Sequence, residues 1–423
     1  MIDLADLRKN PDKYQRACDL KRITFDVHGF VELDSRRNAL RAEAESLRAR
    51  QNSLSKDVPK LQGEEQARMR AELKELSVAV KEANRELGEI ESEWERKQLL
   101  LPSIPSEKVP HGKDDTENVE LYTNGTIPTF NFEIKDHIAL GKLHGLIEVE
   151  RGVKIAGARN YFLTGDGARL HHAVLQCAMD FLNARGYRLM DPPHIVNYEA
   201  MLGTGYFPGG EEMAYHLDER DAQQYLIGTS EVPVAAFHSD EVLREEELPK
   251  RYCGYSPCYR REAGSYGKDT HGLYRVHQFF KVEQVVICRA DEQMSADFHA
   301  ELLRNAEEFM QSLELPYRVV AVCSGDLGQG QVYKNDIETW MPSRQMYSET
   351  HSCSTLHDFQ ARRLKLRYKG EDGKNRYCHT LNNTLVASPR ILIPLLELNQ
   401  RADGTIAIPE ALQPYMRGQK QIG

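Results

Sequence analysis

Residues 258–284 read CYRREAGSYGKDTHGLYRVHQFFKVEQ, and two strand-like runs meet in this stretch. The runs RYCGYSPCYRREA (251–263) and LYRVHQFFKVEQVVIC (273–288) are rich in Tyr, Val and Phe and alternate partly between apolar and polar residues. This composition is typical of β-strands. The glycine-bearing segment GSYGKDTHG (264–272) separates them. The stretch therefore predicts a buried β-hairpin closed by a glycine loop.

The charges of this hairpin should gather on one face of the sheet. Alternate side chains of a strand share a face, which predicts three such sets: Arg260 with Glu262; Arg275 with His277 and Phe279; Lys281 with Glu283. Charge on a buried face is unfavourable unless a ligand or counter-charge meets it. A salt-bridged solvent face is the alternative. An aromatic ring among the cations, Phe279, instead favours a nucleoside triphosphate site.

The surrounding sequence predicts an α+β fold. DFLNARGYRL (180–189) indicates a helix running to Gly186, and MDPPHIVN (190–197) is extended. LPYRVVAVCS (315–324) is strand-like, and DEQMSADFHAELLRNAEEFMQSLEL (291–315) is an amphipathic helix with an acidic cap. Strands without strict βαβ alternation indicate an antiparallel sheet flanked by helices.

A heptad pattern marks the N-terminal region. Leucine recurs every seven residues at Leu33, Leu40, Leu47, Leu54 and Leu61, and a second apolar series, spaced alternately four and three, runs from Met69 to Trp94. Such seams predict two long helices. The short interval with Pro59 and Gly63 predicts an antiparallel coiled-coil arm over about 31–98, whose second helix is roughly 50 Å long at 1.5 Å per residue. An arm of this length should project.

Two domains are expected in a chain of 423 residues. LPSIPSEKVPHGKDD (101–115) is polar and carries three prolines, so it predicts a boundary between an N-terminal domain, 1–102, and a second domain, 103–423. The eight cysteines form no CxxC pair or zinc-spaced cluster, and we expect no zinc. The N-terminus lacks an apolar secretory stretch, and no run is long enough to span a membrane. We expect a soluble cytoplasmic protein.

Net charge excludes one class of function. The chain carries 55 basic and 64 acidic residues, a formal charge of −9, which argues against a generally cationic nucleic-acid coat. A local basic surface remains open. The first helix of the arm has a net charge of +2 and the second −3, which on its own is typical of a solvated coiled-coil face.

Three segments resemble the motifs of the class II aminoacyl-tRNA synthetases. Gly186-Tyr187 followed by Pro193 resembles motif 1 (186–197). Arg260-x-Glu262, the loop and Arg275-x-x-x-Phe279 resemble motif 2 (258–284), and Ala387-x-x-Arg390 resembles motif 3 (382–397). Within that class, the long arm, YLIGTSEVP (225–233), REAGSYGKDTHG (261–272) and ETHSC (349–353) resemble the seryl-tRNA synthetases of the bacterial type. The resemblance covers essentially the whole chain.

The resemblance implies a homodimeric ligase. Such an enzyme makes seryl-adenylate from L-serine and ATP with Mg²⁺, releases pyrophosphate, and transfers serine to the 3′ end of tRNA(Ser), with tRNA(Sec) a further candidate. Catalysis would rest on alignment and neutralisation of phosphate charge, which is consistent with the lack of a proton-transfer constellation. Two alternatives are a related ligase that loads a carrier protein or small molecule, and a non-catalytic tRNA-binding paralogue.

The resemblance also assigns the ATP end of the site. Arg260 matches the arginine on the α-phosphate, Glu262 the residue near adenine, and Arg390 the arginine at the γ-phosphate; these three are the catalytic candidates. Phe279 should stack on adenine. Glu349 and Ser352 match the positions that hold Mg²⁺ through ATP. The full set implied for ATP is Arg260, Arg261, Glu262, Arg275, Val276, Phe279, Glu349, Thr350, His351, Ser352 and Arg390.

The serine end should be small and polar. The resemblance implies serine contacts at Thr229, Ser230, Glu231, Arg260, Glu283, Asn382 and Thr384. Polar groups matched to the substrate hydroxyl would reject alanine, because they would be left unpaired. Thr384 has an alternative interpretation as an ordinary helix cap. Which carboxylate takes the ammonium and which the hydroxyl stays open here.

Two departures from the family pattern stand in motif 3. Asn383-Thr384-Leu385 stands where many members have Gly-Ser-Gly, and Pro389 stands where a small residue precedes the motif arginine. Because of these changes, the sequence does not decide the exact shape of the serine pocket. In the arm, the resemblance implies that the long variable arm of tRNA(Ser) is gripped through shape and charge, with Arg36, Arg37, Arg41 and Arg48 as candidate contacts.

Overall fold

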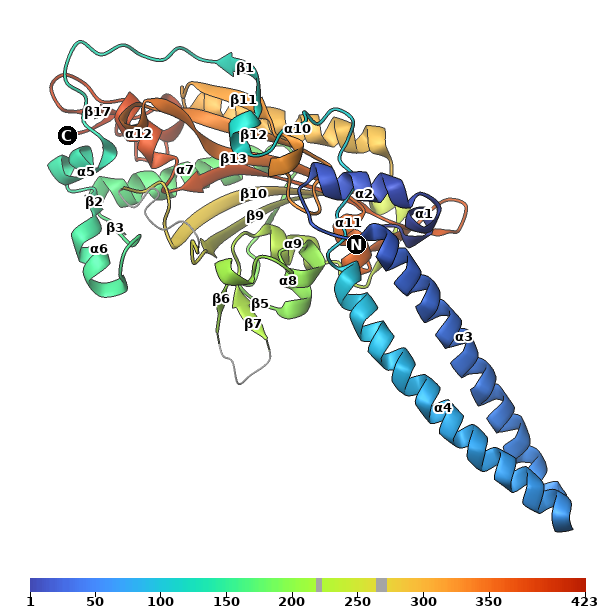
Figure 1. The fold of residues 1–423 in the computed structure, drawn as a ribbon. Coiled ribbons are helices and arrows are strands. Elements are labelled where there is room, and N and C mark those ends of the chain that lie inside the picture. The colour runs from blue at the N-terminus through green and yellow to red at the C-terminus, as the bar shows by residue number, and fades with distance from the viewer. Residues whose placement is uncertain (218–222, 264–271) are drawn as a thin grey trace. The chain divides into compact units, whose positions relative to one another are not determined.

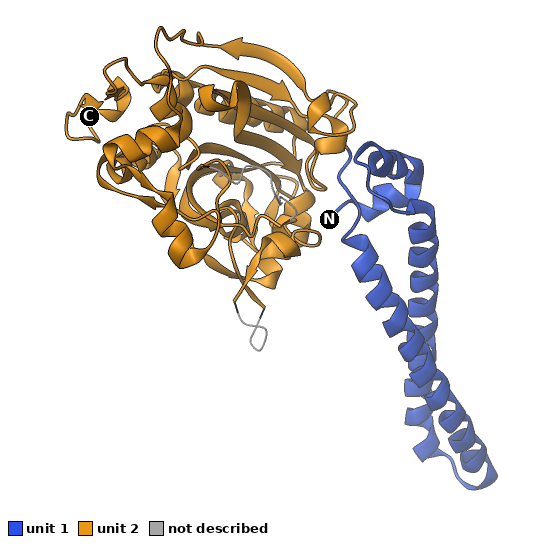
Figure 2. Cartoon of the chain, turned by 60° about the vertical axis from the view of Figure 1, so that its left-hand side comes forward, with its two compact units in different colours: residues 1–104 blue, residues 105–423 orange. Residues whose placement is uncertain are grey.

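The computed structural model describes residues 1–217, 223–263 and 272–423. The chain divides into two compact units, Met1–Ile104 and Pro105–Gly423 (Figure 2). This division falls two residues after the boundary that the prolines predict. The glycine loop expected at 264–272 lies outside the described residues, except for its last residue. In the described part, no helix is long and apolar enough to cross a membrane.

Unit 1 is a small helical base from which two long helices extend side by side (Figures 1 and 2). Asp26 caps the first long helix by accepting a hydrogen bond from the Gly29 amide. At the base, Trp94 stacks on Phe30 with ring centroids 6.1 Å apart. The predicted coiled-coil arm is confirmed. The helices of unit 1 are α1 (Leu4–Lys9), α2 (Pro11–Leu20), α3 (Val27–Asp57) and α4 (Gly63–Gln98).

Unit 2 is built on an eight-stranded sheet (Figure 1). Every neighbouring pair is antiparallel except β4 and β9, which are parallel. The predicted antiparallel-dominated sheet is therefore confirmed. In spatial order its strands are β1 (Val119–Asn124), β11 (Tyr317–Ala321), β12 (Tyr333–Met341), β13 (Met346–His357), β16 (His379–Ser388), β10 (Gln278–Cys288), β9 (Lys250–Tyr259) and β4 (Arg188–Met190).

Helices α7 (Gly165–Asn183) and α10 (Glu292–Ser312) cover one face of this sheet and form the main core with it. Asp291 caps α10 by accepting a hydrogen bond from the Met294 amide, as the acidic start of the segment predicts. Val282 and Val286 of β10 point into this core. By alternation, Lys281 and Glu283 must then point to the opposite face.

Shorter elements surround the sheet. The helices are α5 (His137–His144), α6 (Val149–Ala156), α8 (Tyr198–Thr204), α9 (Glu231–Ala236), α11 (Phe359–Leu364) and α12 (Leu392–Leu398). The strands are β2 (Ile147–Glu148), β3 (Phe162–Leu163), β5 (Ile195–Asn197), β6 (Tyr215–His216), β7 (Gln224–Leu226), β8 (Val242–Arg244), β14 (Arg367–Lys369), β15 (Asn375–Tyr377), β17 (Ile406–Ala407) and β18 (Gln421–Ile422).

The predicted hairpin is present as β9 and β10, which pair with Phe279 opposite Cys258. The strands are shorter than expected, because β9 ends at Tyr259 and β10 begins only at Gln278. The prediction that His277 shares a strand face with Phe279 is therefore wrong. The His277 ring instead lies 2.9 Å from the carbonyl oxygen of Arg260. Strand alternation holds from Phe279 onward, where Phe279, Lys281 and Glu283 line one pocket.

Candidate active site

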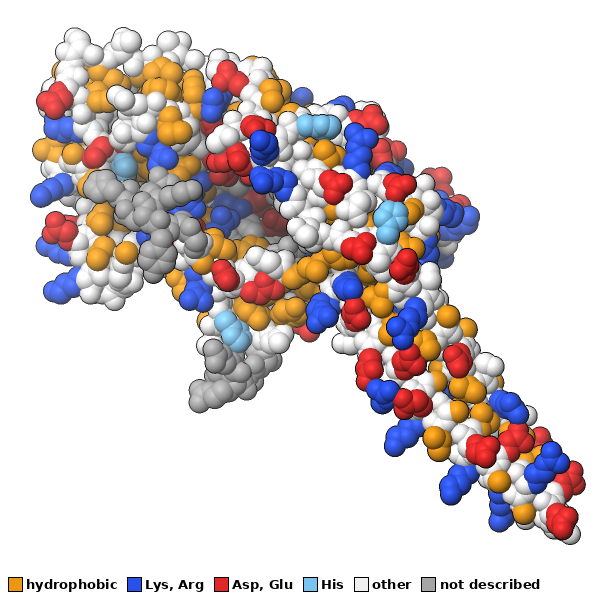
Figure 3. Space-filling view, in the orientation of Figure 1, with side chains coloured by type: hydrophobic (Ala, Val, Ile, Leu, Met, Phe, Trp, Pro, Cys, Tyr) orange, Lys and Arg blue, Asp and Glu red, His pale blue; other side chains and the backbone are white. Residues whose placement is uncertain are grey.

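A charged pocket lies on the sheet face opposite α7 and α10. Its walls come from β10, β13 and β16 and from the segments that follow β9 and precede β10 and α9. Figure 3 shows a hollow in this part of unit 2 in which basic and acidic side chains gather. Fourteen of the predicted site residues line it: Thr229, Glu231, Arg260, Glu262, Arg275, Val276, Phe279, Glu283, Glu349, Thr350, Ser352, Asn382, Thr384 and Arg390.

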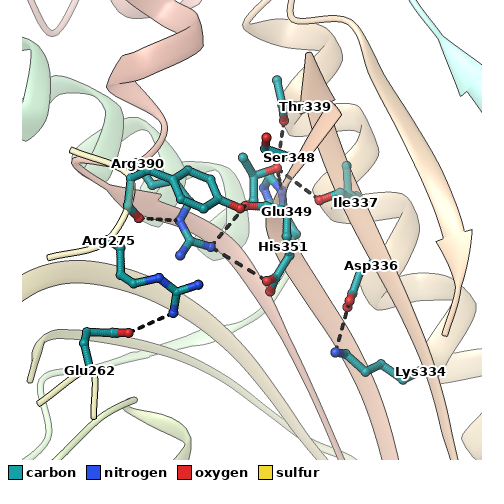
Figure 4. A network of polar contacts seen from close by, with 12 residues as sticks. Glu262, Arg275, Lys334, Asp336, Ile337, Thr339, Ser348, Glu349, His351 and Arg390 are labelled. Carbon is teal, nitrogen blue, oxygen red and sulfur yellow. Dashed lines mark hydrogen bonds and ion pairs between the residues drawn. The ribbon is translucent and has the colours of Figure 1, made fainter. Parts of the chain in front are cut away.

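The motif 2 arginines are held at the end of the hairpin. The Nε of Arg260 donates to the Gly228 carbonyl oxygen at 3.2 Å, and its guanidinium carbon lies 5.2 Å from the centroid of the Phe279 ring. Arg275 donates to the Glu262 carboxylate at 2.9 Å (Figure 4). Glu262 itself adopts a left-handed backbone, φ 51°, which is unfavourable for a residue with a Cβ and is concentrated at functional sites.

Arg390 closes the same end of the pocket from motif 3. Its Nε donates to the Tyr274 carbonyl oxygen at 3.1 Å, and its Nη1 donates to the Glu349 carbonyl oxygen at 3.0 Å. The guanidinium also lies over the Tyr274 ring, 4.4 Å from the centroid. Its ion pair with the Glu349 carboxylate is long, at 3.9 Å. The closer backbone and ring contacts thus orient Arg390 and leave much of its charge available to an anion.

A β-bulge aims Glu349 and Ser352 into one pocket. In the pairing of β12 with β13, His351 lies opposite Ile337 but Glu349 lies opposite Glu338, so Thr350 is the extra residue. A bulge re-aims side chains by breaking the strict alternation of a strand. Glu349 and Ser352 are three residues apart, a spacing that regular alternation would place on opposite faces, yet both line the pocket.

The surrounding cations keep Glu349 ionised. Desolvation in the pocket would raise the pKa of Glu349, whose side chain is 47% exposed, but Arg390, Lys334, Arg260 and Arg275 together hold its pKa below the ordinary value. An ionised carboxylate beside a hydroxyl offers the hard oxygen donors that Mg²⁺ prefers. Within residues 1–217, 223–263 and 272–423, no group of three or more His, Cys, Asp or Glu could hold a metal ion. The donor set therefore fits an ion that arrives with phosphate oxygens.

The end of the pocket where the sequence predicts serine contacts holds two carboxylates in different surroundings, Glu283 buried and Glu231 half-buried. Glu283 forms an ion pair with Lys281 at 2.6 Å and accepts a hydrogen bond from the Thr384 hydroxyl at 3.2 Å. Glu231 accepts a hydrogen bond from the Gln360 amide at 2.7 Å. Burial raises the pKa of Glu231 to about 7, and the nearby Glu283 carboxylate adds to the rise. Thr384 lies inside β16, so its interpretation as a helix cap is wrong.

Three predicted residues do not line the pocket. The Arg261 side chain is exposed, and its backbone amide donates to the Met213 carbonyl oxygen at 2.9 Å. Ser230 is fully buried and donates to the Gly254 carbonyl oxygen. His351 bridges the Thr350 hydroxyl and the Leu385 carbonyl oxygen on the covered side of β13. These hydrogen bonds hold Ser230 against Gly254 and His351 against Thr350 and Leu385. Both residues therefore stabilise the backbone next to pocket residues.

Seven further residues line the pocket without having been assigned to it from the sequence: Leu273, Tyr274, Lys281, Gln331, Ser354, Ala387 and Pro389. Strand alternation already placed Lys281 on the same face as Glu283, without assigning it a role in the site, and could have found Ser354 from Ser352. Gln331 lies just before β12, and its amide donates to Ser354 at 2.8 Å. No local pattern marks Gln331, because its place depends on the pairing of distant strands.

Two family models match the chain. Residues 1–105 match the seryl-tRNA synthetase N-terminal domain, and residues 215–399 match the class II tRNA synthetase core domain of the G, H, P, S and T group. A serine–tRNA ligase of Deinococcus radiodurans is 44% identical over 423 residues, which covers 100% of this chain and 99% of that protein. The chain belongs to the seryl-tRNA synthetase family.

Solved structures of the family agree with this fold. A seryl-tRNA synthetase from Pyrococcus horikoshii, complexed with ATP, superposes with a TM-score of 0.91 at 34% identity, covering 100% of this chain and 99% of that one. A cytoplasmic serine–tRNA ligase from Naegleria fowleri, in complex with AMP, gives a TM-score of 0.85 at 33% identity, covering 98% and 95% of the two chains. The resemblance expected from the motifs is confirmed.

Proposed function

We propose that the chain is a serine–tRNA ligase that activates L-serine with ATP and transfers it to the 3′ end of tRNA(Ser). The observation that carries the proposal is the polarity of the pocket: cationic groups surround Glu349 at one end, and the carboxylates of Glu231 and Glu283 stand at the other. A nucleoside triphosphate and a small ammonium-bearing substrate fit these two ends. As a translation enzyme, the protein would act in the cytoplasm.

The reaction proceeds in two displacements. In the first, a serine carboxylate oxygen attacks the α-phosphorus of ATP, the bond to the β-phosphate oxygen breaks, and pyrophosphate leaves. In the second, a hydroxyl of the terminal tRNA ribose attacks the seryl carbonyl carbon, AMP leaves, and the hydroxyl proton is released. Both steps need reactants held in line and charge neutralised as it develops, which fixed guanidinium groups supply.

At the ATP end, we assign Arg260 to the α-phosphate because its planar fork can meet the attacking carboxylate and the phosphate together. Phe279 offers its ring to adenine, and Arg390 faces the terminal phosphates. The Glu262 carboxylate already accepts a hydrogen bond from Arg275. This contact orients the Arg275 guanidinium before ATP binds.

At the serine end, we assign the ammonium to Glu231 and the hydroxyl to Glu283 and Thr384. Glu283 is charge-matched by Lys281, whereas the Glu231 charge is disfavoured by burial and by Glu283. A cationic ligand relieves that cost at Glu231. A substrate without the hydroxyl would leave Glu283 and Thr384 incompletely paired, which disfavours alanine.

For the metal, we propose that Glu349 and Ser352 hold a Mg²⁺ ion that enters with ATP. The ion would neutralise phosphate charge when bound. The bulge at Thr350 allows both residues to line the same pocket.

We also propose a homodimer formed around the motif 1 segment. Leu189 and Ile195 in this segment are apolar and each 49% exposed, and exposed apolar side chains gathered in one segment are typical of an interface. Light scattering should give twice the 48.3 kDa chain mass. A monomeric mass with full charging activity would contradict the dimer.

In unit 1, we propose the outward arginines of α3 as contacts to the tRNA backbone. Arg36 and Arg41 are exposed and pair with Glu86 and Glu91 across the arm, and Arg48 is exposed. Arg37 is different, because its side chain is buried against Asp34 and lies 3.6 Å over the Trp94 ring. We therefore give Arg37 a structural role at the base of the arm.

The function is tested by comparing Arg260→Ala with Arg261→Ala in serine-dependent exchange of pyrophosphate into ATP. We expect Arg260→Ala to lose roughly a hundredfold or more, since removing one preorganised transition-state donor costs that much. Arg261→Ala should lose less than about tenfold, because an exposed side chain outside the pocket contributes little to the transition state.

The amino-acid and acceptor specificities need separate assays. Each amino acid is offered in turn with total tRNA, and serine alone should give charged product. Absence of serine-dependent exchange would favour a non-catalytic paralogue, and exchange without tRNA charging would favour a carrier ligase. Either result would overturn the proposal.

A further inference from the structure

Strand β12 places a second row of charged side chains directly beside the metal end of the pocket. Cross-strand partners point to the same face of a sheet. Ser352 and Glu349 of β13 line the pocket, so their partners on β12 must lie on that same face. The pairs are Lys334 with Ser354, Asp336 with Ser352, and Glu338 with Glu349.

Asp336 is the residue in this row whose bonding is incomplete. Its side chain is buried, with the residue 5% exposed, and Oδ2 pairs with the Lys334 ammonium at 3.0 Å (Figure 4). Oδ1 is also buried and has no formed hydrogen bond among the described residues, although the nearby Ser352 hydroxyl opposes the rise that burial causes in the pKa of Asp336. A buried carboxylate oxygen without a donor costs free energy in native structures and calls for an explanation.

Glu338, the next acid along β12, has no such deficit. Arg318 of the neighbouring strand donates to it at 2.6 Å, and the same guanidinium reaches Glu120 at 3.2 Å. The two β12 acids therefore share a strand and a face but differ in bonding. Glu338 is held in a salt-bridge network by Arg318, whereas Asp336 lies opposite Ser352 and has one oxygen without a formed hydrogen bond among the described residues.

A serine hydroxyl that binds a cation must direct its lone pairs toward the ion and its hydrogen elsewhere. A carboxylate is the strongest acceptor for that hydrogen. Residues that hydrogen-bond to a metal ligand and so orient it commonly contribute to the affinity for the metal ion. We propose that Asp336 is a positioning residue that accepts the Ser352 hydroxyl hydrogen at Oδ1 when Ser352 binds the cation carried by ATP. This inference rests on the proposed function of the pocket.

The arrangement also explains why Lys334 pairs with Asp336. By holding Oδ2, the ammonium fixes the rotation of the carboxylate and leaves Oδ1 as the oxygen available to Ser352. Burial raises the pKa of Asp336 to about 7, and Lys334 opposes the rise. Lys334 thus supplies both an orientation and a counter-charge.

The test measures Mn²⁺ binding in the presence of a non-hydrolysable ATP analogue, using the electron paramagnetic resonance signal of free Mn²⁺. Asp336→Asn should weaken Mn²⁺ binding by about tenfold, as loss of a group behind a metal ligand commonly does. Glu338→Gln is the matched control and should stay within about twofold of the unmodified protein, because it removes a half-buried acid of the same strand that is paired with Arg318. Unchanged Mn²⁺ affinity in folded Asp336→Asn would overturn the inference.

A double-mutant cycle shows whether Asp336 acts through Ser352. In a Ser352→Ala background, Asp336→Asn should cause no further loss beyond about twofold, because the hydroxyl it positions is gone. The same tenfold loss in both backgrounds would overturn the positioning role. If the unmodified protein binds no Mn²⁺ with the analogue, the proposed nucleotide site fails together with this inference.

A measurement on the unmodified protein covers the case in which Asp336→Asn does not fold. A crystal structure with Mn²⁺ and the analogue, located by anomalous scattering, should show Ser352 Oγ on the ion and about 2.5–2.7 Å from Asp336 Oδ1, the range of a charge-assisted O–H···O⁻ bond. A Ser352 ligand whose hydroxyl donates to another group, or an ion that Ser352 does not touch, would overturn the inference.

Discussion

Glu231 and Glu283 show how neighbouring groups give two identical side chains different chemistry. Lys281 and Thr384 support the charge of Glu283, whereas burial raises the pKa of Glu231 to about 7. The sequence identifies both acids as pocket residues through their motifs. It does not show what surrounds Glu231, because Gln360 reaches that carboxylate through the fold and not through sequence spacing.

Serine binding should depend on pH through Glu231. The substrate ammonium favours the ionised carboxylate, and a group with a pKa of about 7 is mostly protonated below that pH. Binding must then expel a proton, so the dissociation constant for serine should fall as the pH rises from about 6 to about 8, by up to tenfold per unit on the acid side. Calorimetric titration of serine at several pH values measures this slope.

Glu231→Gln is the comparison for this prediction. The amide cannot ionise, so its serine affinity should be weaker and nearly independent of pH over the same range. A variant that keeps the original slope would show that another group, such as Asp336, is responsible for the pH dependence.

Three elements are tied together at the end of motif 2 by one histidine. His137 begins α5, and its Nε2 accepts a hydrogen bond from the Leu273 amide at 3.1 Å. Nε2 is therefore unprotonated, and Nδ1 donates to the Glu397 carboxylate of α12 at 2.7 Å. The other oxygen of Glu397 accepts from the Ser343 amide at 2.9 Å. This network fixes the backbone just before Tyr274, whose carbonyl oxygen receives Arg390.

His137→Asn should weaken ATP binding without affecting serine binding. The shorter side chain can still donate from the Nδ1 position but cannot reach Leu273. Losing one such hydrogen bond costs about 0.5–1.5 kcal/mol, which predicts a rise of about twofold to tenfold in the KM for ATP. His238→Asn is the control, since His238 also pairs with a carboxylate, Glu241, but among the described residues it forms no hydrogen bond with one that lines the pocket, whereas His137 holds Leu273. Equal effects of both variants on ATP would contradict a specific role for His137.

Regular patterns of side chains predicted the long helices and the strands of the hairpin, whereas most of the short elements and the irregular positions were not predicted. The heptad leucines and the capped segment after Asp291 predicted α3, α4 and α10, because periodicity and caps are local properties. Alternation failed at His277, where β10 had not yet begun. It also could not explain why Glu349 and Ser352 share a pocket, because the extra residue of the bulge is defined only by its pairing with Ile337 and Glu338.

At the scale of the whole chain, the two units carry separable tasks in the proposed function. The pocket is built entirely from residues of unit 2. The arm has its own small core at its base, where Trp94 donates to Asp34 at 2.9 Å and Phe30 packs on the Trp94 ring. Shortening the arm beyond this core should therefore leave both the base of unit 1 and the pocket intact.

Replacing residues 44–80 with a short glycine-rich turn should abolish most tRNA charging while leaving serine-dependent pyrophosphate exchange unchanged. The deletion keeps the cluster of Phe30, Asp34 and Trp94. The shortened helices can therefore still pack against each other at the base of the arm. It removes Arg48 and the far part of the surface that we propose for the tRNA backbone. Measuring both activities on one preparation separates the two tasks, and charging that survives at ordinary tRNA concentrations would show that the outer arm is only structural.

A single-residue version of this experiment tests charge directly. Arg48→Ala should weaken tRNA binding and flatten its salt dependence by up to roughly one unit of log–log slope for each tRNA phosphate that the variant no longer neutralises. Arg85→Ala is the control, because it removes the same single positive charge from the other helix of the arm, α4. If the two variants change the salt slope equally, the effect comes from the overall charge of the arm, and the assignment of α3 as the face that meets the tRNA backbone is wrong.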